Sequence, residues 1–174
     1  SLFNSDVGFI GFGNLAKSLL PLLKPFNCNV SVYDPWLSKE YLESQGVHAV
    51  SLDILLSKNK FIFILAGVTS ENEGFINKEK LKLIEKDSSI ILVSRAEILD
   101  FEEFIMLAEQ NNYRAAVDVF PEEPVPLNAS FRKESNILFT SHVAGAMHFS
   151  YKNIREMMMD DIRQILKGMP PTRL

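Results

Sequence analysis

Short apolar runs alternate with amphipathic stretches along this chain, and the alternation predicts strands and helices in turn. The runs with strand character occupy residues 7–10, 29–33, 47–50, 61–65, 89–93, 114–119 and 137–140. The stretches with helical periodicity occupy residues 14–24, 38–45, 52–56, 78–85, 100–111 and 151–167. Because strands and helices alternate throughout, we expect an α/β fold: a doubly wound parallel sheet with right-handed crossovers, packed as a single three-layer domain.

Polar residues and prolines set the expected ends of several helices. Ser38, Ser51, Asn77 and Asp100 each precede a helical stretch and carry the short side-chain oxygen that caps a first turn. Pro21 lies inside the first helical stretch, where a proline removes a backbone hydrogen bond at a cost of roughly 3 kcal/mol. We therefore expect that helix to kink or to end early near Pro21.

Two glycines one residue apart join the first strand to the first helix. Gly11 and Gly13 directly follow the first apolar run, and Ala16 comes three positions after Gly13. In this context the pattern is the Gly-x-Gly-x-x-Gly/Ala fingerprint of dinucleotide-binding Rossmann folds. Gly11 allows the turn, Gly13 lets the backbone approach a pyrophosphate, and Ala16 lets helix and strand pack closely. The amides of Asn14 and Leu15 would face the phosphates at the positive end of the helix dipole.

An acidic residue at the end of the second strand supports the same interpretation. Asp34 lies 21 positions after Gly13, where the fingerprint has the carboxylate that bonds the ribose hydroxyls of an adenosine. A carboxylate there repels a 2′-phosphate, so this pair favours NAD over NADP. Each feature also has a simpler explanation: an ordinary glycine-rich turn, and an aspartate that forms a turn before Pro35. The separation of the two features favours dinucleotide binding.

Further polar residues follow other predicted strands: Thr69, Ser94, Arg95, Asp118, Glu123 and His142. The carboxyl ends of parallel strands meet at one edge of the sheet, where doubly wound folds bind their ligands. Singly, these residues are a surface arginine, a turn-forming aspartate, a solvated glutamate or a packed histidine. Jointly, an Arg, a Glu and a His would converge on the edge of the sheet where the dinucleotide is expected.

Composition narrows the class of protein. The chain has 174 residues, 47% of them hydrophobic, and a net charge of −4, so it has no broad basic surface for nucleic acid or anionic membrane. No apolar run approaches the roughly 18 residues that a membrane span needs. The one cysteine, Cys28, excludes an internal disulfide and fits a reducing compartment, so we expect a cytoplasmic protein. That cysteine and three scattered histidines form no zinc-type cluster, so no metal is expected.

Six segments together carry a family resemblance. They are Val7–Ala16, Tyr33–Pro35, Thr69–Asn77, Ser94–Asp100, Val117–Pro124 and Ser141–Ala146. In this order and at this spacing they resemble the NAD-binding domain of the D-isomer-specific 2-hydroxyacid dehydrogenases, over most of the chain. In the usual family pattern an arginine precedes a glycine, a glutamate precedes a proline, and a histidine opens a His-hydrophobic-Ala-Gly/Ser segment. Arg95, Glu123 and His142 take these three positions.

The resemblance implies an oxidoreductase that transfers hydride between NAD(H) and a 2-hydroxy acid/2-keto acid pair. His142 would be the general acid/base at the C2 oxygen, Glu123 would bond its other ring nitrogen, and Arg95 would bind the substrate carboxylate and carbonyl. The residues implied for binding the NAD cofactor are Gly11, Gly13, Asn14, Leu15, Asp34, Thr69, Ser94, Asp118 and Gly145.

The chain departs from the family pattern at four positions near this site. Ala96 stands where a glycine usually follows the arginine, and Gly67 stands where proline is common. Leu92 and Met147 occupy positions that are commonly polar in the family. None of these departures removes one of the three implied catalytic side chains.

The resemblance also implies a domain organisation. We expect residues 1–5 to be a linker or non-native residues, 6–168 to be the NAD-binding Rossmann domain, and 169–174 to be a C-terminal tail. A substrate-binding domain is expected to be absent from this chain, so the chain should bind NAD but turn over hydroxy acids poorly. The implied partners are a small 2-hydroxy or 2-keto acid and a second copy of the chain, in a homodimer formed through this domain.

The sequence leaves two alternatives open. The chain could be a non-catalytic NAD-sensing module of the kind found in dehydrogenase-like transcriptional corepressors, which share the fold. It could also be a degenerate relative without activity. Retention of all three implied catalytic residues favours an enzyme ancestor but does not separate an enzyme from a corepressor.

Overall fold

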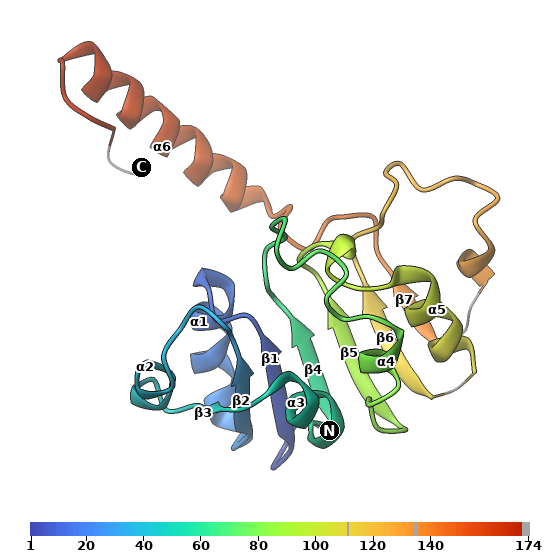
Figure 1. Cartoon of the computed structure of the whole chain (residues 1–174). Helices are drawn as coiled ribbons and strands as arrows, with labels where there is room; N and C mark the ends of the chain where they lie inside the picture. The colour runs from blue at the N-terminus through green and yellow to red at the C-terminus, as the bar shows by residue number, and fades with distance from the viewer. Residues whose placement is uncertain (111, 134–135, 172–174) are drawn as a thin grey trace. The chain divides into compact units, whose positions relative to one another are not determined.

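The computed structural model of the chain describes residues 1–110, 112–133 and 136–171. The chain forms two compact units, Ser1–Ser141 and His142–Leu174. The first unit contains a seven-stranded sheet with helices packed against it, and the second contains one long helix (Figure 1).

The strands of the first unit are all parallel and have the order β3-β2-β1-β4-β5-β6-β7. They are β1 (Asp6–Ile10), β2 (Asn29–Tyr33), β3 (His48–Ala49), β4 (Phe61–Ile64), β5 (Ser88–Leu92), β6 (Tyr113–Val117) and β7 (Ile137–Phe139). The doubly wound parallel sheet that the sequence predicts is therefore confirmed. From β1 to β3 successive strands are added toward one edge of the sheet, and from β4 to β7 they are added toward the other edge. The switch point between β1 and β4 is where folds of this kind bind their ligands.

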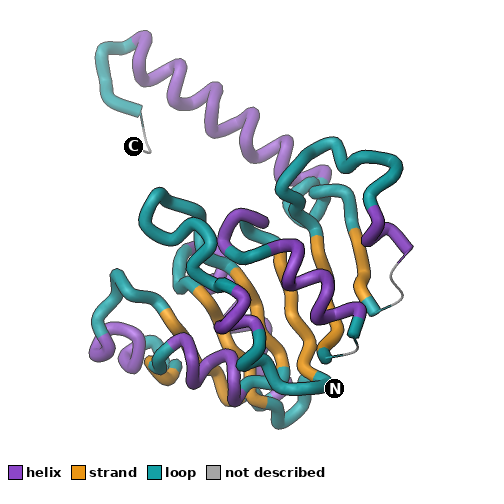
Figure 2. The backbone as a smooth tube through the Cα atoms, turned by 45° about the vertical axis from the view of Figure 1, so that its right-hand side comes forward, coloured by secondary structure: helices purple, strands orange, loops and turns teal. Residues whose placement is uncertain are grey.

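Helices lie on both faces of this sheet (Figure 2). They are α1 (Asn14–Leu23), α2 (Lys39–Ser44), α3 (Leu52–Lys58), α4 (Lys78–Leu81) and α5 (Phe101–Glu109). α1 and α2 pack on one face, where Phe9 and Val32 are buried. α3, α4 and α5 pack on the other face around Ile62, Ile90 and Phe104. β1 is covered on both faces from Val7 onward, which explains why residues 7–10 are apolar without interruption.

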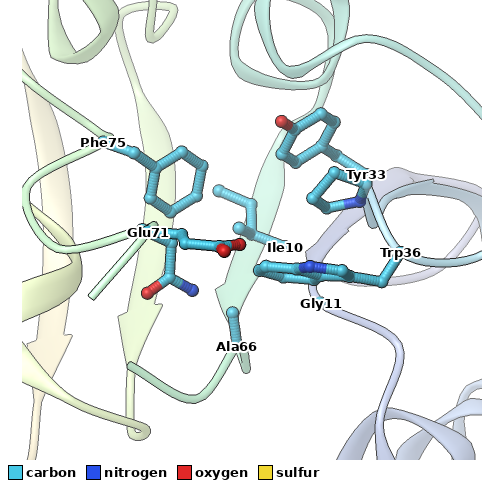
Figure 3. Close-up of a pocket in the computed structure, with 9 residues that line it drawn as sticks. Ile10, Gly11, Tyr33, Trp36, Ala66, Glu71 and Phe75 are labelled. Carbon is cyan, nitrogen blue, oxygen red and sulfur yellow. The ribbon is translucent and has the colours of Figure 1, made fainter. Parts of the chain in front are cut away.

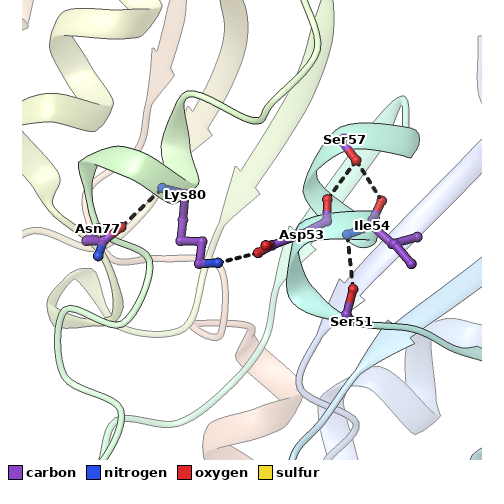
Figure 4. Close-up of polar contacts among 6 residues, drawn as sticks. All are labelled: Ser51, Asp53, Ile54, Ser57, Asn77 and Lys80. Carbon is purple, nitrogen blue, oxygen red and sulfur yellow. Dashed lines mark hydrogen bonds and ion pairs between the residues drawn. The ribbon is translucent and has the colours of Figure 1, made fainter.

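Side-chain caps begin four of these helices, as the sequence predicts. In each helix the cap oxygen accepts a hydrogen bond from the backbone amide three residues further on; the caps are Ser38, Ser51, Asn77 and Asp100. An ion pair between Lys80 and Asp53 joins the start of α4 to the start of α3 (Figure 4). The caps satisfy backbone amides at the helix starts, and the ion pair links the two short helices to each other.

One helix ends near Pro21, as expected, and another is shorter than predicted. α1 passes through Pro21 and continues for two residues before it tightens into a 3₁₀ turn, Lys24–Phe26. Pro21 lies in the last turn, so its missing N–H weakens only the end of the helix. The helix predicted over 78–85 is a single turn, Lys78–Leu81. After Leu81 the backbone hydrogen bonds span three residues, and the side chain of Ile84 is buried.

The register of the central strands brings their carboxyl ends level. Ile10 of β1 pairs with Tyr33 of β2 on one side and with Ile64 of β4 on the other. The loops that follow these three strands therefore leave the sheet side by side. This edge is where the sequence predicts the dinucleotide site.

The second unit contains α6 (His148–Leu166), which begins three residues before the predicted helix 151–167. Apolar side chains recur every three or four positions along α6 and are exposed: Tyr151, Ile154, Met158, Ile162 and Ile165. Within the described ranges, each helix is too short or too polar to cross a bilayer. The expected domain boundary at residue 168 stays a prediction.

We predict that Gly8→Ala destabilises the fold through α3. A Cβ at Gly8 would lie 2.7 Å from Cδ2 of Leu55 and 3.2 Å from Cγ of Asn59. Overpacking of this kind costs about 1–3 kcal/mol in free energy of unfolding. The matched test repeats the substitution in a Leu55→Ala background and measures unfolding by chemical denaturation. The loss should be smaller in that background, and equal losses would contradict close packing of α3 on β1.

Candidate cofactor-binding site

Gly11 turns the chain from β1 into the loop that precedes α1. Its φ is +91°, a conformation that side chains disfavour. A Cβ at Gly11 would also lie 2.7 Å from the backbone nitrogen and from Cα of Ala66, which follows β4. The Gly11 amide donates to the Tyr33 carbonyl at 2.9 Å. The fold itself therefore requires glycine here.

Gly13 caps α1 and faces open space. Its φ is −80°, and a Cβ added there would meet nothing within 4 Å. The first amide to bond within the helix is that of Lys17, which donates to the Gly13 carbonyl at 3.0 Å, so the amides of residues 14–16 precede the helical ladder. Amides at a helix start bind anions. Gly13 thus leaves a bare backbone cradle that fits a pyrophosphate.

Asp34 ties the glycine loop to the end of β2. One carboxylate oxygen accepts a hydrogen bond from the Phe12 amide at 2.8 Å, and the other accepts from the Trp36 amide at 3.0 Å. A carboxylate has about four lone-pair sites, so two such bonds leave acceptor capacity for ribose hydroxyls. Asp34 therefore combines a structural contact with the chemistry needed for a ribose.

A cavity of about 310 Å³ opens over the carboxyl end of β1, and we call it the first cavity (Figure 3). Its lining residues come from the ends of β1, β2 and β4: Ile10, Gly11, Tyr33, Pro35, Trp36, Ala66, Glu71, Asn72 and Phe75. The walls are mostly apolar, and the rings of Tyr33 and Phe75 stack at 6.1 Å. This size and lining are typical of small-molecule sites, and the cavity suits a planar base.

Asn72 holds the loop that follows β4. Its Oδ1 accepts a hydrogen bond from the Thr69 amide at 2.7 Å, and its Nδ2 donates to the Gly67 carbonyl at 2.8 Å. Asn72 is buried, which fits a side chain that replaces backbone partners inside a turn. The Thr69 hydroxyl accepts from the Glu71 amide at 3.3 Å, so Thr69 also serves this loop.

Only Gly11 of the nine residues that line the first cavity was identified as a site residue from the sequence, and four of the eight that were missed are loop residues with large or polar side chains. They are Trp36, Glu71, Asn72 and Phe75. Trp36 follows the Asp34-Pro35 pair closely, and the other three lie in the loop after β4. In the sequence, the only sign that these residues belong to a site is that they follow a central strand. That position does not reveal which side chains of a loop point into a cavity.

A second cavity, of about 380 Å³, brings together three of the predicted site residues. Leu15, Ser94 and Arg95 line it with apolar residues from the ends of β4 and β5. The Ser94 hydroxyl is buried, and among the described residues it has no hydrogen-bond partner. Arg95 is exposed, and its Nη1 donates to the Ser94 carbonyl at 2.7 Å. A buried orphan hydroxyl beside an exposed guanidinium fits a polar ligand.

Asp118 and Glu123 follow β6. Asp118 is buried, and its Oδ1 accepts a hydrogen bond from the Thr140 hydroxyl at 2.5 Å. Glu123 is exposed, and its Oε1 accepts from the Phe120 amide at 3.0 Å. Both carboxylates are therefore held at the edge of the sheet that the other site residues share.

His142 and Gly145 belong to the second unit, of which His142 is the first residue. His142 has a φ of +54°, which a non-glycine residue seldom adopts. Its predicted pairing with Glu123 stays a prediction, as does the role of Gly145. Over residues 1–110, 112–133 and 136–171, no group of three or more His, Cys, Asp or Glu side chains is arranged to hold a metal ion.

We predict that substitution by alanine lowers stability at Gly11 and weakens cofactor binding at Gly13. Gly11→Ala should lower the melting temperature, because its Cβ meets the backbone at Ala66. Gly13→Ala should leave the melting temperature within about 2 °C, since its Cβ meets nothing, yet weaken NADH binding at least about tenfold by filling the phosphate cradle. Thermal unfolding and calorimetric titration measure the two effects. A Gly13→Ala protein that binds NADH normally would contradict the cradle.

Sequence comparison matches the chain to one protein family and to related enzymes. Residues 1–144 match the family described as D-isomer specific 2-hydroxyacid dehydrogenase, NAD binding domain. The chain is 29% identical to a D-3-phosphoglycerate dehydrogenase of Synechocystis over 170 residues, which are 97% of this chain and 30% of that protein. It is 24% identical to a glyoxylate reductase of Korarchaeum cryptofilum, over 99% of this chain and 52% of that protein.

A solved structure agrees with these sequences. A phosphoglycerate oxidoreductase from Rhizobium etli superposes with a TM-score of 0.84 at 36% identity, over 97% of this chain and 51% of that one. The chain thus spans about a third to a half of the length of its relatives. The glycine loop, the acidic residue after β2 and the match over residues 1–144 agree: the chain belongs to the D-isomer specific 2-hydroxyacid dehydrogenases as an NAD binding domain, and NAD is its cofactor.

Proposed function

We propose that the chain is the cofactor-binding part of an oxidoreductase that transfers hydride between NAD(H) and a 2-hydroxy acid/2-keto acid pair. The observation that carries this proposal is the glycine loop, which is tied to Asp34 and leaves an open cradle at Gly13. The named relatives are dehydrogenases and reductases, so the corepressor-like alternative is not favoured.

Each of the two cavities would bind one end of the cofactor. The amides that follow Gly13 would bind the pyrophosphate, and Asp34 would accept hydrogen bonds from the hydroxyls of the adenosine ribose. The adenine would enter the first cavity, whose apolar walls suit a flat base. The nicotinamide, which exchanges hydride with substrate, would lie toward the second cavity, near Ser94 and Asp118.

The substrate would bind beside that second cavity through Arg95. Its guanidinium fork suits a carboxylate and a carbonyl oxygen, and Arg95 is exposed at the rim. His142 would take the proton from the C2 hydroxyl during oxidation and return it during reduction. Glu123 would bond the other ring nitrogen and hold the tautomer of the imidazole. The order of the three residues after β5, β6 and β7 supports these roles.

Three further features belong to the proposal. The remaining contacts to the substrate would come from a second domain, as the roughly half-length match to relatives suggests. A homodimer through this domain is supported by exposed apolar side chains such as Leu138 on β7. A cytoplasmic location is supported by the single, unpaired Cys28.

We predict that the chain binds NADH at least about 100-fold more tightly than NADPH, because the Asp34 carboxylate repels a 2′-phosphate. Asp34→Asn removes the charge at nearly constant size but leaves one of the two backbone amides without an acceptor, so both cofactors should bind more weakly and the preference should fall to about tenfold or less. Calorimetric titration gives both dissociation constants. Asp53→Asn, at an exposed carboxylate outside both cavities, should keep the full preference. A wild-type preference for NADPH would overturn the role of Asp34.

We predict that NADH oxidation with a panel of 2-keto acids is slow for the chain alone and depends on His142. Loss of the acid/base group should reduce the rate about 100-fold or more in His142→Ala. His48→Ala, at an exposed histidine on β3, is the matched control and should keep the rate. Unchanged turnover in His142→Ala would refute the assigned base. Turnover as fast as in full-length relatives would contradict the need for a second domain.

A further inference from the structure

The Glu71 side chain enters the first cavity from the loop after β4. Its carboxylate points into the space between Ile10 and the indole of Trp36 (Figure 3). In the parts of the chain that the structure describes, no hydrogen bond or ion pair engages this carboxylate, although the Glu71 amide bonds the Thr69 hydroxyl. A charged acceptor therefore faces a cavity whose other walls are largely apolar.

The loop fixes where this carboxylate lies. Asn72, the next residue, is buried and makes hydrogen bonds of 2.7 and 2.8 Å to the Thr69 amide and the Gly67 carbonyl. Such bonds hold the backbone on both sides of Glu71 and limit the positions that its carboxylate can take. The backbone that carries Glu71 is thus held by hydrogen bonds, and its exposed side chain lies at the mouth of the first cavity.

We propose that Glu71 determines the specificity for the purine base by accepting a hydrogen bond from the exocyclic amino group of adenine. This inference rests on the proposed function, which puts the adenine in the first cavity. Asp34 would hold the ribose at the end of β2, and Glu71 reaches in from the loop after β4, on the opposite side of β1. The base would span this distance, so its amino edge, which is remote from the ribose, meets Glu71.

The chemistry of the two groups gives the discrimination. An ionised carboxylate only accepts hydrogen bonds, and the amino group of adenine donates them. Hypoxanthine has a carbonyl oxygen at this position, which only accepts, and its N1–H donor lies one ring position away, so the base would have to shift before it could donate to Glu71. Bonds to a charged group are stronger than neutral ones, and a discrimination of about tenfold is expected at this partly open site.

The tests use the only tryptophan of the chain as a reporter. Trp36 lines the same cavity, so a bound base should quench its fluorescence. Titrations with NADH and with its hypoxanthine analogue, reduced nicotinamide hypoxanthine dinucleotide, give two dissociation constants for each protein. We expect the wild-type chain to bind NADH about tenfold more tightly than the analogue.

Two substitutions isolate the carboxylate. Glu71→Gln keeps the length of the side chain but adds an amide that donates as well as accepts, so the two dissociation constants should agree within about twofold. Glu73→Gln removes a charge from the same loop at an exposed residue that does not line the cavity, and should keep the tenfold preference. Melting temperatures check that both variants fold.

The outcomes separate this inference from the proposed function. A tenfold preference that persists in Glu71→Gln, or no preference in the wild-type chain, overturns the role of Glu71 while NADH binding still stands. Absence of NADH binding by calorimetry overturns the proposed function as well. A preference that is lost in Glu71→Gln and kept in Glu73→Gln supports the inference.

Discussion

The hydrogen bond from the Phe12 amide to the Asp34 carboxylate is the contact on which the rest of the site depends. It joins the loop after β1 to the end of β2 at 2.8 Å, next to the backbone bond from Gly11 to Tyr33. A loop with two glycines loses much conformational entropy when it becomes ordered, and this pair of bonds offsets part of that cost. These bonds hold the backbone that leads to Gly13 without any contribution from a ligand, and preorganisation of this kind favours affinity.

The other residues of the site lie at the carboxyl ends of successive strands. β1 supplies the phosphate cradle and β2 supplies the ribose acceptor. The loop after β4 separates the two cavities, since Ala66 lines the first cavity whereas Leu65 and Gly67 line the second. β5 brings Ser94 and Arg95, and β6 brings Asp118 and Glu123. Parallel strands in level register make this division possible, because every loop concerned leaves the sheet at one edge.

Sequence patterns predicted the strands, the four helix caps and the glycine turn, because each depends on local periodicity or on the chemistry of one residue. The extent of α4 was predicted wrongly: the chain after Leu81 continues with hydrogen bonds that span three residues, and Ile84 is buried, which the local periodicity does not display. The inward side chains of Glu71 and Asn72 were missed, because the direction of a loop side chain follows from hydrogen bonds that a sequence does not display. Arg95, Glu123 and His142 were recognised only jointly, by family resemblance, and their roles stay predictions.

The bonds between the glycine loop and Asp34 point to a dinucleotide site that is formed before NAD binds. A crystal structure of the chain with NAD bound is the decisive test. We expect the pyrophosphate over the amides that follow Gly13, the adenosine ribose on Asp34, and little movement of the loop that carries Phe12. A cofactor bound elsewhere, or a loop whose Phe12–Asp34 bond breaks to admit it, would show that the site is not preformed.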